Sequence, residues 1–228
     1  MRQSISDSAI VLSRLDYAEK DRILTVLTSQ HGKLRAIAKS VRSAKSKLAG
    51  GIELFAENEL VLVQGRGELY TVTSSRMKHY FGNIAKNSEA SMYVYECLKF
   101  INKVTPDGAG GEYYDSLAKL LKALDEAEVP FEQIKIWYGL KVLESLGALP
   151  NFITDSDNKR LVESGSFQYD FDKHCFFEQK DGPFDADHIK ILRFLLRIPQ
   201  PLEIKNIQKE VIDSTENLVR LILLNQSA

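Results

Sequence analysis

The chain has 228 residues, of which 44% are hydrophobic and 27% are charged, and this is the composition of an ordinary globular protein. Its apolar runs are far shorter than the roughly 18 to 20 residues that span a bilayer, and its amino terminus does not read as a signal peptide, so we expect no membrane insertion. Two widely spaced cysteines, Cys97 and Cys175, fit a reducing compartment better than a disulfide framework, and we expect a cytoplasmic protein.

The nearly balanced total charge hides an uneven distribution along the chain. Residues 1–80 contain 13 lysines and arginines against 8 carboxylates, whereas residues 81–228 contain 17 against 23. A basic first part joined to an acidic second part predicts a division of labour, in which only the first part binds a polyanion.

The first 80 residues have the pattern of strands. Five short segments are β-branched or alternate between apolar and polar residues, at 9–12, 22–28, 33–39, 59–64 and 68–74. The turn Gly65-Arg66-Gly67 joins the fourth and fifth as a hairpin. No helix in this part is long enough to cover an open sheet, so the pattern favours a small closed barrel and leaves an OB-like and an SH3-like barrel both open.

From about Phe81 onward, apolar residues recur with the period of a helix. Three amphipathic helices are predicted, with apolar faces that include Cys97, Leu117 and Leu140 respectively. Residues 150–184 lack that period and alternate aromatic residues, which predicts a small β-hairpin insertion. Helices follow at 188–197, near 203–211 and near 215–225. We therefore predict a nucleic-acid-binding domain at 1–80 and a helical domain at 81–228, with the insertion at 150–184.

Motifs for catalysis and for metal binding are weak in this chain. It contains none of the glycine-rich nucleotide-binding loops, no GxSxG and no HExxH. Asp172, His174, Cys175 and His188 are the best candidate metal ligands, but zinc sites use paired cysteines or histidines at short spacing, which are absent here. Asp155 and Asp157 could bind magnesium as in a nuclease, although an Asx turn is the favoured interpretation.

Residues 31–50, HGKLRAIAKSVRSAKSKLAG, contain six cations and no carboxylate. In a strand over residues 33–39, alternation would direct the cations to one side and Leu34, Ala36 and Ala38 to the other. The following serine-rich segment could track a phosphate backbone. We therefore predict a nucleic-acid-binding surface at Lys33, Arg35, Lys39, Arg42, Lys45 and Lys47, and expect packing for Tyr17, Phe55 and Tyr70 more than stacking on bases.

Several stretches of this sequence together resemble the RecO family of bacterial recombination mediators. They are AIVLSRLDYAEKDRILTVLTSQHGKLRAIAKSVRSAKSKLAG (9–50), the phenylalanine of IELF (52–55), GRGELYTVTSS (65–75), YVYECLKFI (93–101) and LKVLESLGALPNF (140–152). The similarity covers most of the chain and is most specific in its first 75 residues.

The resemblance implies an α+β protein with an amino-terminal five-stranded OB-fold β-barrel, followed by a helical bundle with a small zinc-finger-like insertion. It implies binding of single- and double-stranded DNA, strand annealing, and cooperation with RecR in loading RecA onto DNA coated by the single-strand binding protein SSB. It implies no covalent catalysis. The family's DNA-binding face would fall on the six cations named above and on Arg66, in a bacterial protein associated with the nucleoid.

This sequence departs from the family pattern at two places. Many members carry four zinc-binding cysteines in the insertion, whereas here only Cys175 is present, so we expect a metal-free insertion with an aromatic core. Ser40 stands where the family commonly has glycine. An RNA-binding OB module and a metal-dependent nuclease are the alternative functions. Binding of the acidic tail of SSB would need a basic and apolar groove, for which Lys135, Lys141, Arg193 and Arg197 are candidates.

Overall fold

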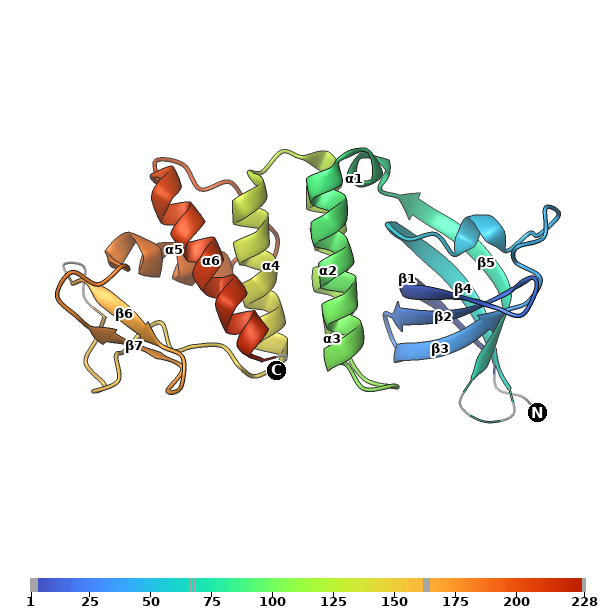
Figure 1. Cartoon of the computed structure of the whole chain (residues 1–228), viewed down its shortest axis with the longest axis horizontal. Helices are drawn as coiled ribbons and strands as arrows, with labels where there is room; N and C mark the ends of the chain where they lie inside the picture. Colours follow the sequence, from blue (N-terminus) through green and yellow to red (C-terminus); the bar gives the residue numbers. More distant parts are fainter. Residues whose placement is uncertain (1–3, 66, 68, 162–164, 227–228) are drawn as a thin grey trace. The chain divides into compact units, whose positions relative to one another are not determined.

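The computed structural model describes residues 4–65, 67, 69–161 and 165–226 (Figure 1). The chain forms two compact units, Met1–Glu126 and Ala127–Ala228. The change from strands to helices falls after Tyr80, next to the predicted boundary, but contacts group the first three helices with the strands. The division into domains at residues 80 and 81 stays a prediction.

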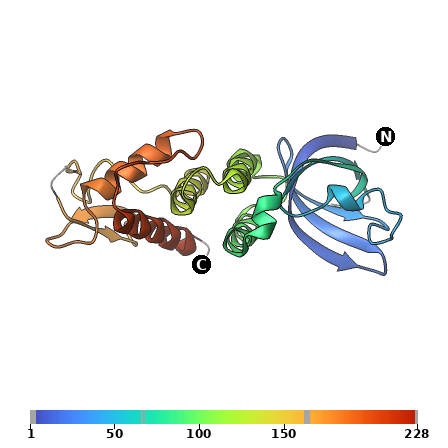
Figure 2. The ribbon, with the colours of Figure 1, turned by 90° about the horizontal axis from the view of Figure 1, so that it is seen from above.

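The first unit begins with five strands that form a closed barrel. Around the ring the order is β1, β2, β3, β5, β4, and β4 returns to β1. All neighbours are antiparallel except β3 and β5, which pair in parallel. This ring confirms the predicted OB fold, and Figure 2 shows the strands curving around its interior. The strands are β1 (Ser4–Tyr17), β2 (Asp21–Thr28), β3 (Gly32–Ala38), β4 (Ala56–Gln64) and β5 (Tyr70–Tyr80).

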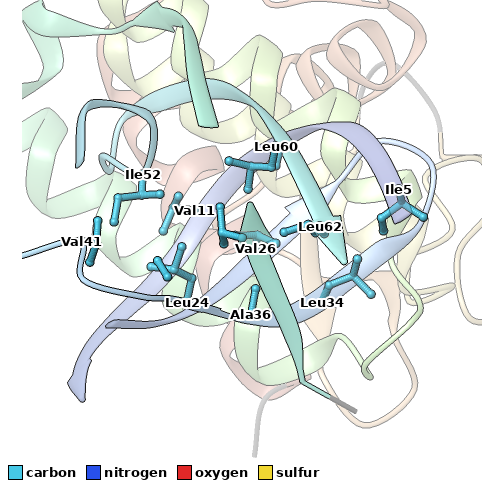
Figure 3. Close-up of a cluster of buried hydrophobic side chains, with 13 residues drawn as sticks. Ile5, Val11, Leu24, Val26, Leu34, Ala36, Val41, Ile52, Leu60 and Leu62 are labelled. Carbon is cyan, nitrogen blue, oxygen red and sulfur yellow. The ribbon is translucent and has the colours of Figure 1, made fainter. Parts of the chain in front are cut away.

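Aliphatic side chains from all five strands fill the barrel, and Figure 3 shows the larger ones pointing inward from the strands and from the segment after β3. Each strand contributes alternate residues, as the period of two in a half-buried strand requires. The cluster consists of Ile5, Ala9, Val11, Leu24, Val26, Leu34, Ala36, Ala38, Val41, Ile52, Leu60, Leu62 and Val72.

β1 is much longer than the predicted segment at 9–12. Its first half pairs with β4 and its second half pairs with β2, and the register shifts between Val11 and Ser13. A strand that closes a barrel needs two partners in this way, and an irregularity allows it to bend from one to the other. The predicted hairpin at residues 65–67 is confirmed, because β4 and β5 pair antiparallel on either side of it.

Three helices complete the first unit: α1 (Gly82–Lys86), α2 (Ser88–Val104) and α3 (Gly111–Glu126). The side chain of Asn87 caps α2 by accepting from the backbone N–H groups of Glu89 and Ala90. α2 contacts β1, and α3 contacts β1, β2 and β3. These helices therefore cover part of the outer surface of the barrel.

The second unit contains α4 (Phe131–Ser145), α5 (Ala186–Arg197) and α6 (Lys209–Asn225). α4 packs against both of the others, and Gly139 permits close approach to α6, since a Cβ atom there would collide with Val219. Of the two short helices predicted near 203–211 and 215–225, the second is present as part of α6, whereas most of the first and the break between them are wrong. Residues 203–208 are not helical, and α6 runs without a break from Lys209, with the hydroxyls of Ser214 and Thr215 donating to carbonyls of the preceding turn.

The predicted hairpin insertion is present as β6 (Phe167–Asp170) and β7 (Cys175–Glu178), which pair antiparallel. Phe176 is fully buried and makes aromatic contacts with Phe152, Tyr169 and Phe184, at centroid distances of 6.2, 5.2 and 5.8 Å. The insertion thus has the aromatic core expected from its sequence. In the described part of the chain, no helix is long and apolar enough to cross a bilayer.

Candidate nucleic-acid interface

β3 divides its side chains between the barrel interior and the outer surface. Leu34, Ala36 and Ala38 belong to the barrel core. Arg35 lies between them on the opposite side and is exposed to solvent. The alternation predicted from the sequence is therefore present, and it directs the guanidinium group of Arg35 away from the core.

Lys33 is on the outer side of β3, but the loop between α2 and α3 covers it. Its Nζ atom donates to the carbonyl oxygen of Asn102 at 2.9 Å and lies 3.4 Å from a carboxylate oxygen of Asp107. Only 10% of its side chain is exposed. The sequence grouped Lys33 with the DNA-binding cations, whereas the structure places it apart from them, in a contact that joins β3 to the helices.

The segment after β3 is bonded to the barrel at both of its ends. The backbone N–H of Ser40 donates to the carboxylate of Asp21 at 2.7 Å, and the N–H of Arg42 donates to the carbonyl of Lys20 at 3.0 Å. Val41 inserts between them into the core (Figure 3). At the other end, the hydroxyl of Ser75 donates to the carbonyl of Leu48 at 2.9 Å. Residues 40–42 therefore lie beside the turn that joins β1 to β2, and the far end of the segment, at Leu48, is bonded to β5.

Ser40 adopts a left-handed backbone conformation, with φ of 52°. This region of φ costs a residue with a Cβ atom more than it costs glycine. The backbone at residue 40 thus follows the course that a glycine favours, although the sequence has serine there.

Five cations gather on and after β3, and we call them the basic surface: Arg35, Lys39, Arg42, Lys45 and Lys47. All five are exposed. Within the described residues, Arg42 alone among them has a carboxylate in ion-pair range, with its Nε atom 3.5 Å from Asp16. Arg66, the other predicted DNA-binding residue, lies outside the residues that the structure describes.

Arg42 of the basic surface and two neighbouring arginines act electrostatically on Asp16, at the end of β1. A hydrogen bond from Arg22 at 2.8 Å, together with the charges of Arg42 and Arg14, holds the pKa of Asp16 below its usual value. Asp16 thus stays ionised at neutral pH and neutralises part of the charge here. Arg35, Lys39, Lys45 and Lys47 form no ion pair with a described carboxylate and are therefore open to phosphates.

An apolar row crosses the outer face of β1, β2 and β3 next to the basic surface. Leu15 pairs with Ile23, and Ile23 pairs with Ile37. Leu15 is 64% exposed, and its neighbour on the same side of β1, Tyr17, is 52% exposed. The sequence pattern does not single out Leu15 and Ile23, because only the register between strands shows that they adjoin Ile37.

The three aromatic residues considered for stacking differ in accessibility. Phe55 is buried and contacts the ring of Tyr95, at a centroid distance of 4.9 Å. Tyr70 packs against the barrel core. Tyr17 remains as the member of this group whose ring is open to a ligand.

The candidate metal ligands of the second unit do not come together. His188 is buried, with Nδ1 2.8 Å from the carboxylate of Asp185 and Nε2 2.7 Å from the hydroxyl of Ser214. No group of three potential ligands that could hold a metal ion occurs among the described residues. The zinc that the family resemblance implies for many members therefore does not fit this insertion, whose centre is occupied by aromatic rings. The carboxylate of Asp155 accepts from the N–H groups of Asp157 and Lys159, which is the Asx turn favoured from the sequence.

Three of the four cations that are candidates for binding an acidic peptide have partners within the second unit. Lys135 pairs with Glu216 at 3.2 Å. Lys141 donates to the carbonyl of Leu196 at 2.7 Å, and Arg193 donates to that of Phe152 at 2.8 Å. Arg197 is exposed, and no carboxylate of the described residues forms an ion pair with it.

Comparison with known proteins gives one consistent family. The model described as "Recombination protein O N terminal" matches residues 1–81, which contain the whole barrel. A "DNA repair protein RecO" from Alkaliphilus metalliredigens (strain QYMF) is 27% identical over 206 residues, covering 90% of this chain and 83% of the relative. Another, from Dehalococcoides mccartyi (strain ATCC BAA-2266 / KCTC 15142 / 195), is 28% identical over 221 residues, covering 93% and 86%. Residues 1–81 thus match the amino-terminal part of the RecO family, and the chain is similar to proteins named RecO along most of its length.

Proposed function

We propose that this protein is a DNA-binding recombination mediator in DNA repair, and that it binds single- and double-stranded DNA through the basic surface. The observation that carries the proposal is the set of five exposed cations on one side of the barrel, four of which have no described carboxylate as an ion-pair partner. The names of its relatives, "DNA repair protein RecO", support the role in repair.

Phosphate binding by such a surface is favoured by counterion release. Each cation that neutralises a phosphate frees a condensed counterion, so affinity depends steeply on salt and little on sequence. Arg35 is on a strand fixed by the barrel and Lys39 directly follows it, while Lys45 and Lys47 come from a segment bonded at both ends. A surface that is already arranged before binding loses little conformational entropy when DNA binds.

The steps beyond DNA binding are proposed from the similarity to the RecO family. We infer that the protein anneals complementary strands and, with RecR, helps to load RecA onto single-stranded DNA coated by SSB, whose acidic tail would contact a cation of the second unit such as Arg197. We infer a role without covalent catalysis, in the cytoplasm at the bacterial nucleoid. Annealing needs a protein that can hold two strands without locking their bases, and phosphate contacts meet that requirement.

The direct test is DNA binding by a variant in which Lys39→Glu and Lys45→Glu are combined. Neither lysine pairs with a described carboxylate, so the fold should tolerate the change. The matched control combines Lys180→Glu and Lys209→Glu, two exposed lysines of the second unit, and alters the net charge equally. Fluorescence anisotropy would measure binding of a labelled single strand, a duplex and an RNA of equal length, with and without magnesium.

The first variant should lose at least about tenfold in affinity for both DNA forms at moderate salt, and the control should lose far less. Equal binding by the two variants would show that the basic surface is not the DNA site. Tighter binding of RNA than of DNA would favour the RNA-binding alternative, and cleavage that depends on magnesium would favour a nuclease.

A further inference from the structure

The outer face of β1, β2 and β3 carries apolar residues at two places, and helices of the first unit cover only one of them. Ile10 and Leu27 pair with each other at the covered part and are 1% and 0% exposed. Farther along the same face, Leu15 and Tyr17 are more than half exposed. A large apolar side chain that is exposed on a sheet, next to others, marks a surface for a ligand more often than a solvated surface.

The strand register places the exposed apolar residues in ordered rows. Leu15, Ile23 and Ile37 are directly opposite one another across three strands, and Thr71 of β5 continues the row. With strands about 4.8 Å apart, the row is roughly 10 Å long from β1 to β3. Tyr17 stands two residues beyond Leu15, on the same side of β1, at about 7 Å.

Cations adjoin this apolar row on β3. Arg35 lies two residues before Ile37, about 7 Å along the strand on the same outer side, and the exposed Lys39 directly follows the end of β3. A ligand that offers both apolar flat groups and negative charges fits this surface. A single strand of nucleic acid does so, because its bases are unpaired while its phosphates are charged.

We propose that Leu15, Tyr17, Ile23 and Ile37 form a platform that contacts unpaired bases, so that single-stranded DNA is held by bases and phosphates together and duplex DNA by phosphates alone. The proposal rests on the DNA-binding function above and specifies which form of DNA each part of the surface recognises. The bases of a duplex are stacked inside the double helix and cannot lie on a sheet without being separated. The apolar row would thus distinguish the two forms.

The experiment compares affinities for a single strand, for a duplex, and for an abasic single strand that keeps its phosphates. The variant combines Leu15→Thr with Tyr17→Ala, both at exposed positions of β1. The matched control combines Met92→Thr with Tyr80→Ala, which are also exposed in the first unit, at 63% and 47%, but lie on α2 and β5. The charge-reversed Lys39→Glu and Lys45→Glu variant serves as the test of phosphate binding.

The wild type should bind the normal strand more tightly than the abasic one, and the platform variant should lose about five- to a hundredfold for the normal strand. Its affinities for duplex and for abasic DNA should stay within about twofold of the wild type, with the same salt dependence. The platform proposal would be overturned if the variant still preferred the normal strand over the abasic strand as the wild type does. It would also be overturned if the variant lost equal affinity for single strand and duplex. If neither the platform variant nor the charge-reversed variant weakened DNA binding, the assignment of phosphate binding to the basic surface would be wrong. Failure of the platform proposal and failure of the proposed DNA-binding site therefore give different results.

Discussion

Asp7 is a buried carboxylate that fastens β1 to the turn between β2 and β3. It accepts hydrogen bonds from the hydroxyl of Ser29 at 2.6 Å and the N–H of Gln30 at 3.0 Å, and its other close neighbour is Nδ1 of His31 at 2.7 Å. Burial alone would raise the pKa of Asp7, but these hydrogen bonds outweigh it and lower the pKa below the usual 3.8. The carboxylate therefore stabilises the folded barrel only while it is ionised.

Replacing this carboxylate by Asp7→Asn should destabilise the first unit by about 1 to 3 kcal/mol at neutral pH, because an amide cannot accept from all of these donors. Since the folded state has the lower pKa, the contribution is complete above about pH 4 and is lost as the pH falls through the folded-state value. Urea unfolding followed by far-UV circular dichroism would measure the free energy of unfolding of the wild type and the variant at neutral and acidic pH. Trp137, the single tryptophan, lies in the second unit, and its fluorescence is an internal control. A difference between wild type and variant that does not shrink in acid would contradict this account.

Lys33 and Lys39 are both on β3 or directly after it, and the structure gives them different roles. Lys33→Met removes the donor to the carbonyl of Asn102, so the first unit should lose about 1 to 3 kcal/mol of stability. Its affinity for single-stranded DNA should nevertheless remain close to that of the wild type.

Lys39→Met is the matched control and should show the reverse pattern, with normal stability and several-fold weaker DNA binding. Unfolding midpoints and anisotropy titrations on the two variants would measure both properties. If Lys33→Met weakened DNA binding as much as Lys39→Met does, Lys33 would belong to the basic surface after all. Alternation in the sequence could not separate these lysines, because what distinguishes them is the loop at residues 105–110, distant in sequence, that covers only Lys33.

At the scale of elements, local pattern predicted most strands and helices but not how far each extends. β1 exceeds its predicted segment because residues such as Ser6 and Ser8, which are not β-branched, are held by pairing with β4. This pairing joins parts of the chain some 50 residues apart, and the β-propensities of individual residues cannot predict it. Likewise, the break predicted inside α6 is absent, because packing against α4 and α5 stabilises the helix around the buried Thr215.

The insertion shows how aromatic packing can organise a small hairpin. Phe176→Ala should destabilise the second unit by about 3 to 5 kcal/mol, since the ring is fully buried among other aromatic residues. Phe177→Ala, on the same strand but half-buried, is the control and should cost much less. Urea unfolding followed by Trp137 fluorescence would report both changes, and a strong chelator should leave the wild-type midpoint unchanged. A chelator that lowered the midpoint would show that a metal stabilises the insertion.

At the scale of the whole molecule, the charge asymmetry read from the sequence persists between the two compact units. Met1–Glu126 contains 18 basic and 15 acidic residues, and Ala127–Ala228 contains 12 and 16. The helices α1 to α3 bring carboxylates into the first unit, so the contrast is smaller than between residues 1–80 and the remainder. The cations of residues 35–47 still stand out, because four of the five have no described carboxylate in ion-pair range.

Sequence alone could predict the barrel and its basic segment, because both depend on local alternation and composition. It could not predict the apolar row of Leu15, Ile23 and Ile37, since their proximity depends on the register of three strands. It also could not show that Lys135, Lys141 and Arg193 are engaged within the second unit, because those partners depend on tertiary packing.

The central claim is that phosphates are bound by the basic surface, and its most direct test is the salt dependence of single-strand binding. The logarithm of the affinity constant would be measured against the logarithm of salt concentration for the wild type and for Lys39→Gln combined with Lys45→Gln. If both lysines bind phosphates, the slope should become shallower by about 1.4, because each lysine that no longer neutralises a phosphate removes about 0.7. The paired change Lys180→Gln with Lys209→Gln should leave the slope unaltered. A slope identical to the wild type in the first variant would contradict the assignment of the DNA site to this face of the barrel.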